Sequence, residues 1–140
     1  MTKILSHKEA REVIDTGGLG RLGCLDQGGP YVVPINYIVD GDEIFSHSLP
    51  GKKIDAMRVY PRVCLQVDNI CDDFHWRSAL AFADFEEVTD LNQKTWVLRR
   101  LLERFPKLTP VESQLARDAD PPPVIVFRLR IDHISGVAEE

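Results

Sequence analysis

The chain has 140 residues, a length that fits one domain with a real core and hardly allows a second. Its net charge is −5, with 44% apolar and 28% charged residues, which is ordinary for a globular protein and argues against an extended nucleic-acid-binding face. No apolar run approaches the roughly 20 residues of a membrane-spanning helix, and residues 1–7 are too polar for a signal peptide. We therefore expect a single cytoplasmic domain over residues 1–140, without a membrane or nucleic-acid partner.

The first half of the chain predicts one helix followed by strands. Ser6 and Glu9 form a capping box, which opens a helix that ends near Gly17. The apolar patterns that follow predict three strands, at residues 20–25, 31–39 and 43–47. Asp40 and Gly41 predict a type I′ hairpin between the second and third of these strands.

The second half predicts two helices among three further strands. The helices are expected at residues 52–60, where Pro61 ends the helix, and at residues 91–105, which Asp90 caps. The strands are expected at residues 62–67, 77–89 and 124–134. An acidic loop is expected at residues 68–74, and the stretch before the last strand has no regular pattern. Six strands with hairpin connections and few helices predict a mainly β fold, an antiparallel barrel with peripheral helices.

Pro34 lies inside the predicted strand at residues 31–39. Since proline has no N–H for the ladder, this strand should lie at a sheet edge or carry a bulge. The interrupted ladder leaves backbone groups that could pair with a planar heterocycle that has its own donors and acceptors. The alternative is a plain edge strand that binds nothing.

Residues 46–53, Ser-His-Ser-Leu-Pro-Gly-Lys-Lys, lie between a predicted strand and a predicted helix. Lysines at a helix start are unfavourable by about a few tenths of a kcal/mol unless an anion lies nearby. Hydroxyls, a glycine, free N–H groups and two cations together are typical of a phosphate cradle. The alternative is a solvated turn with two surface lysines.

The three cysteines, Cys24, Cys64 and Cys71, have no CxxC spacing, and an odd count favours free thiols. Cys24 and Cys64 lie in strand patterns and are expected in the core. Cys71 lies in the acidic loop, but no ligand cluster has zinc spacing, so no metal site is expected.

Several motifs occur in an order and spacing that resemble one known superfamily. They are Gly20–Gly23, Pro30–Tyr37, Phe45–Ser48, Gly51–Lys53, Pro61–Cys64 and Trp76–Ser78. With them the chain resembles the pyridoxamine 5′-phosphate oxidase-like, FMN-binding split-barrel superfamily, in the branch of nitroimidazole-resistance and flavin-nucleotide-binding proteins. The resemblance implies a six-stranded antiparallel split β-barrel and a homodimer with FMN in two interface clefts. It leaves haem or a deazaflavin as alternative cofactors.

The resemblance also implies which residues bind the cofactor. The strand whose backbone lines the isoalloxazine edge matches Val33, Pro34, Ile35 and Asn36. The strand that reaches the ribityl chain and phosphate matches Ser46, His47 and Ser48. The paired basic residues that hold the phosphate match Lys52 and Lys53. A segment from the partner subunit matches Trp76, Arg77 and Ser78, and the acidic loop is expected to position Trp76, which could instead be a core residue.

His47 matches the active-site histidine of the nitroimidazole-resistance branch, and a structural histidine on a barrel face is the alternative. Val33 stands where the vitamin-forming oxidases have a phosphate-binding arginine, and their C-terminal substrate segment has no counterpart, so vitamin B6 oxidation is not expected. The expected function is an FMN-dependent oxidoreductase that acts on a small, for example nitroaromatic, substrate. The alternative is a non-catalytic flavin- or haem-binding protein.

Overall fold

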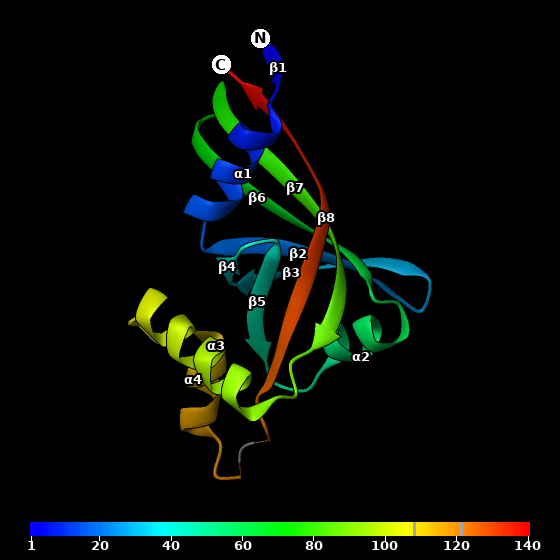
Figure 1. Cartoon of the computed structure of the whole chain (residues 1–140), viewed down its shortest axis with the longest axis vertical. Helices are drawn as coiled ribbons and strands as arrows, with labels where there is room; N and C mark the ends of the chain where they lie inside the picture. Colours follow the sequence, from blue (N-terminus) through cyan, green and yellow to red (C-terminus); the bar gives the residue numbers. More distant parts are fainter. Residues whose placement is uncertain (108, 121) are drawn as a thin grey trace.

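The computed structural model of the chain describes residues 1–107, 109–120 and 122–140. In these ranges, eight strands form one antiparallel sheet in the order β3-β2-β6-β7-β8-β5-β4, with β1 paired to β8 (Figure 1). The strands are β1 Thr2–Ile4, β2 Leu19–Asp26, β3 Gly29–Asn36, β4 Ile38–Asp40, β5 Glu43–Ser48, β6 Arg62–Asp72, β7 His75–Glu87 and β8 Ile125–Glu139. Six long strands confirm the predicted mainly β class, to which β1 and β4 add three residues each.

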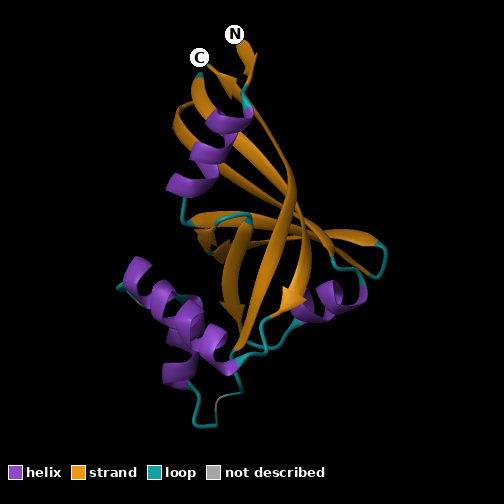
Figure 2. Ribbon diagram, viewed as in Figure 1, coloured by secondary structure: helices purple, strands orange, loops and turns teal. Residues whose placement is uncertain are grey.

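Four helices lie around the sheet in the described ranges (Figure 2). They are α1 His7–Thr16, α2 Lys52–Val59, α3 Leu91–Arg104 and α4 Pro110–Arg117. The capping box of Ser6 and Glu9 starts α1, and the side chain of Asp90 caps α3, both as predicted. None of these helices is long and apolar enough to cross a membrane, within the described part of the chain.

Two apolar clusters bury β5 on both of its faces. On one face, Ile44 joins the barrel core, which includes Leu22, Leu65, Val67 and Leu129. On the other face, Phe45 packs with Val97 and Leu101 of α3, and its ring meets the edge of Trp96 at 5.6 Å. The next residues of β5, Ser46 to Ser48, are therefore buried as well.

β3 lies at an edge of the sheet and, among the described residues, pairs only with β2, which confirms the edge position predicted from Pro34. Its register with β2 is unbroken, so Pro34 sits in a plain edge strand without a bulge. The single strand predicted at residues 31–39 is divided in the structure, since β3 ends at Asn36 and β4 begins at Ile38, with Tyr37 outside both. There the hydroxyl donates to the carbonyl of Ile14 at 2.6 Å and the N–H donates to Gly18 at 3.2 Å.

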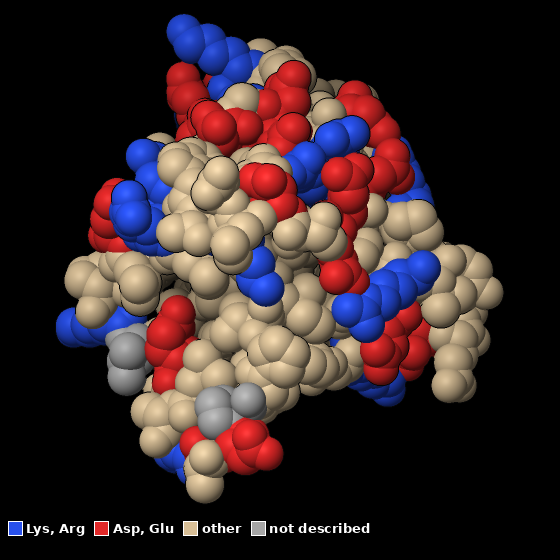
Figure 3. Space-filling view, turned by 60° about the horizontal axis from the view of Figure 1, so that its bottom comes forward, with Lys and Arg blue, Asp and Glu red and all other residues tan. Residues whose placement is uncertain are grey.

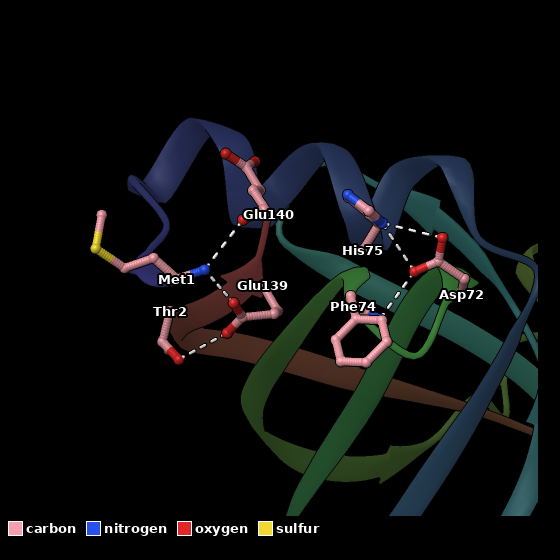
Figure 4. A network of polar contacts seen from close by, with 7 residues as sticks. All are labelled: Met1, Thr2, Asp72, Phe74, His75, Glu139 and Glu140. Carbon is pink, nitrogen blue, oxygen red and sulfur yellow. Dashed lines mark hydrogen bonds and ion pairs between the residues drawn. The ribbon is translucent and has the colours of Figure 1, made fainter.

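The predicted acidic loop at residues 68–74 is wrong. β6 continues to Asp72, and only residues 73–74 turn into β7. Residues 69–72 are exposed, so backbone pairing rather than burial holds this end of the hairpin, and no alternation marks it in the sequence. Figure 4 shows Asp72 accepting from the Phe74 N–H and from His75, beside a second cluster in which Glu139 binds Thr2 and the amine of Met1.

Two further predictions need correction. The last strand runs past Ile134 to Glu139, through Gly136, where a Cβ would lie 2.9 Å from the carbonyl oxygen of Ser78 and 3.1 Å from Ala10. Glycine is therefore what lets α1 pack closely on this strand. The turn at Gly41 is in the predicted place, but Gly41 has φ 61° while Asp42 keeps a negative φ, which fits type II′ rather than type I′.

Candidate functional site

The predicted phosphate residues gather at the start of α2. Gly51 is the N-cap of this helix, and no side chain caps the first N–H groups from that position. Ser48, Lys52 and Lys53 line a hollow of about 240 Å³ in front of this helix end, and Pro110 and Val111 of α4 form another part of its wall. A serine and two lysines thus line one space beside a helix N-terminus.

The two lysines have different surroundings. Lys52 is largely exposed, its Nζ lies 3.1 Å from Asp26 Oδ2, and it also lies over the ring of Tyr31 at 5.0 Å. Lys53 is half-buried, and burial lowers its pKa. A partly desolvated cation gains more from an incoming anion than an exposed cation that a carboxylate already holds. Lys53 is therefore better placed to bind an anion in the hollow.

The three predicted residues of β5 are buried, and two of them are engaged with other elements. Ser46 Oγ donates to the Asn36 carbonyl at 2.5 Å, which ties β5 to β3. His47 Nε2 lies 2.8 Å from Glu112 Oε1 of α4, and the His47 side chain is only 3% exposed. Ser48 Oγ donates to the Leu49 carbonyl at 2.7 Å, and Ser48 is the one of the three that lines the hollow.

The predicted residues of β3 divide between the core and the surface. Ile35 is buried in the barrel core, and Val33 packs against that core. Pro34 is exposed, and Asn36 lines a second hollow of about 430 Å³ whose walls include Phe105 and Pro110. Pro110 lines both hollows and so lies between them, and we call the two hollows together the trough.

Trp76, Arg77 and Ser78 lie far from the trough within one chain. They begin β7 at the hairpin beside the chain termini, whereas α2 lies near the other end of the sheet (Figure 1). Ser78 Oγ accepts from Gln66 at 2.9 Å, and Arg77 lies 3.4 Å from Glu140. A single chain therefore does not bring these three residues together with Lys53.

Sequence reasoning missed α4 and its residues Thr109 and Glu112. Glu112 accepts from Thr109 as well as contacting His47. Burial opposes ionisation of Glu112, but these hydrogen bonds outweigh it and hold the pKa of its carboxyl below the usual value. The pattern Thr-Pro-x-Glu, a capping-box spacing with proline at the first helical position, was a signal for this helix.

The lower end of the molecule, which carries the start of α2 and the pair α3 and α4, is turned towards the viewer in Figure 3. Uncharged atoms cover the middle of this face, and acidic and basic side chains lie around its margin. Selectivity for an anion at this end would therefore come from individual groups such as Lys53 rather than from a broad basic surface.

The sequence matches the family described as pyridoxamine 5′-phosphate oxidase over residues 6–138. The chain belongs to this family. The match covers all the sheet strands from β2 to β7 and nearly all of β8, and it confirms the resemblance seen in the sequence motifs.

Three proteins that are similar to this chain are described next. A FAD-binding protein of Mesorhizobium loti has 29% identity and a TM-score of 0.80, over 100% of this chain and 99% of that one. A Bacteroides thetaiotaomicron protein, named as a 5-nitroimidazole antibiotic resistance candidate, has 21% identity and a TM-score of 0.73, over 100% and 93%. An uncharacterised protein of Rhizobium meliloti is 35% identical over 86 residues, which are 61% of this chain and 57% of that protein, little more than half its length. The structural matches confirm the predicted split-barrel fold.

Proposed function

We propose that the protein binds a flavin nucleotide in the trough and acts as a flavin-dependent oxidoreductase on a small-molecule substrate. The observation that carries this proposal is the hollow at the start of α2. There an uncapped helix N-terminus, the half-buried Lys53 and Ser48 surround one space, which suits a phosphate group. The Mesorhizobium loti protein, named as FAD-binding, supports a flavin as the group that carries this phosphate.

The residues of the trough divide the binding between them. Lys53, Ser48 and the first N–H groups of α2 would hold the phosphate, and the Asn36 end of the trough would take the ring system. A bound flavin supplies the electron-transfer chemistry, and the chain supplies orientation and exclusion of water. FMN and FAD both contain the riboflavin phosphate that this arrangement fits. We propose FMN as the bound nucleotide, and the experiment compares it with FAD.

We also propose that the protein works as a cytoplasmic homodimer. The face of β2 and β3 turned away from the core exposes Leu19, Leu25 and Val32, with Val32 63% exposed, and these apolar side chains around Arg21 offer a surface to a second copy. The distance between Trp76 and Lys53 within one chain also favours a site completed by the partner. Cys24, Cys64 and Cys71 are all free thiols, as suits a reducing compartment.

The test is the optical spectrum of the purified protein, followed by release of the bound group and chromatography against FMN and FAD. We expect flavin absorption that NAD(P)H bleaches and a small electron acceptor restores. A protein that binds neither FMN nor FAD on titration would contradict the proposal, and a Soret band would indicate haem instead. A bound flavin that is not repeatedly reduced by a reductant and reoxidised by an acceptor would indicate a non-catalytic flavin protein.

A further inference from the structure

α4 forms part of the trough although it has little apolar anchorage of its own. None of its eight residues is buried, whereas α1 buries Ala10, Val13 and Ile14. Yet its first residue, Pro110, lines both hollows. Polar contacts must therefore contribute much of what keeps this wall in place.

Those contacts centre on Glu112. One of its carboxylate oxygens lies 2.8 Å from His47 Nε2 of β5, and the other accepts from the hydroxyl of Thr109, the N-cap of α4. His47 is fixed in the sheet and directly precedes Ser48, which lines the hollow. A continuous hydrogen-bonded path thus joins the floor of the site on β5 to its wall on α4.

The contact between His47 and Glu112 is a hydrogen bond with one direction. Nε2 faces the Glu112 carboxylate and donates to it, while buried Nδ1 has no hydrogen-bond partner among the described residues. An ionised carboxylate only accepts hydrogen bonds, so the His47 nitrogen that faces Glu112 is the donor. This bond holds the Glu112 carboxylate in place beside β5.

We propose that His47 and Glu112 are positioning residues that fasten the start of α4 over the flavin-phosphate hollow. The inference rests on the proposed function and gives His47 a role that needs no contact with cofactor or substrate. When the fastening is lost, Pro110 and Val111 no longer close the hollow, water enters, and the nucleotide dissociates faster.

The test compares Glu112→Ala with Gln114→Ala, an exposed position on the same helix, and with the conservative Glu112→Gln. Glu112→Ala should weaken FMN binding about tenfold through a faster dissociation rate, in line with the loss of a charge-assisted hydrogen bond. Glu112→Gln keeps an acceptor for His47 Nε2 and should recover most of the affinity. Gln114→Ala should bind as the wild type does, and the melting temperature of all three should change little.

A second measurement needs no flavin. Trypsin cleavage after Arg117, at the end of α4, reports how firmly the helix is held. Because Gln114 accepts a hydrogen bond from Arg117 at 3.2 Å, the wild type is the reference here, and we expect faster cleavage in Glu112→Ala than in the wild type. Equal cleavage rates would overturn the fastening. Faster cleavage with unchanged FMN affinity would overturn the positioning role while the proposed function stands. A wild-type protein that binds no flavin would overturn the proposed function, and the positioning role with it.

Discussion

At the scale of single residues, the two neighbouring lysines of α2 are the most informative pair. The sequence predicts that both hold phosphate, because local spacing makes Lys52 and Lys53 equivalent. The sequence could not show that Asp26 and Tyr31, from the hairpin of β2 and β3, already contact the Lys52 ammonium. Those contacts depend on how that hairpin packs beside α2. Only the fold separates a surface ion pair from a half-buried cation.

We expect Lys53→Ala to weaken FMN binding about ten- to hundredfold, the effect of losing one hydrogen bond to a charged group. Lys52→Ala should cost less, because Asp26 already holds that ammonium in an exposed pair. Riboflavin has no phosphate and should bind all forms alike. Fluorescence titration with both ligands is the measurement, and an equal loss for riboflavin and FMN would mean general disruption.

Glu9 offers a residue-scale prediction that needs no ligand. The hydrogen bond from the backbone N–H of Ser6, with Lys3 beside it, holds the pKa of Glu9 at about 2, below its usual 4.5. Since this pKa is depressed in the folded state, the contribution to stability is complete above about pH 4.5 and is lost as the pH falls towards 2. An NMR titration should find this value, and Lys3→Ala should raise it. An unchanged value in Lys3→Ala would show that Lys3 has no part in the shift.

At the scale of elements, sequence patterns found those whose cause is local. The capping box of Ser6, the cap of Asp90 and the edge position of Pro34 each depend on a few adjacent residues, and all three are confirmed. The patterns failed where the cause is distant. Tyr37 separates β3 from β4 and is held by a hydrogen bond to Ile14 of α1, and residues 69–72 are strand because β7 pairs with them.

Gly136 provides a prediction about how closely α1 packs on β8. Gly136→Ala places a Cβ 2.9 Å from a backbone oxygen of β7 and 3.1 Å from Ala10, so α1 or the strand pair must move. We expect a loss of about 1–3 kcal/mol in the free energy of unfolding, as for other overpacked sites. Gly29→Ala is the control, because its Cβ would meet only an ordinary contact at 3.6 Å. Urea denaturation compares the two, and equal midpoints would refute the close packing.

At the scale of the whole molecule, the distance between Trp76 and Lys53 predicts complementation between subunits. Proteins that carry only Trp76→Ala or only Lys53→Ala should each bind flavin weakly. If each site takes Lys53 from one chain and Trp76 from the other, a mixed dimer contains one intact site, so mixing the two proteins should restore tight binding. Sedimentation should show dimers throughout, and mixing without recovery would show that Trp76 and Lys53 of different chains do not share a site.

The position of β8 in the sheet has a consequence for synthesis of the protein. β8 pairs with β7 on one side and β5 on the other. In the part of the chain that the structure describes, only these pairings join β3-β2-β6-β7 to β5-β4 within the sheet. A ribosome that has released residues up to about 120 has therefore exposed two half-sheets, each with an unpaired edge where β8 belongs. Such edges invite pairing with other chains, and contacts between distant segments form slowly. The nascent chain should consequently depend on chaperones until its last strand emerges.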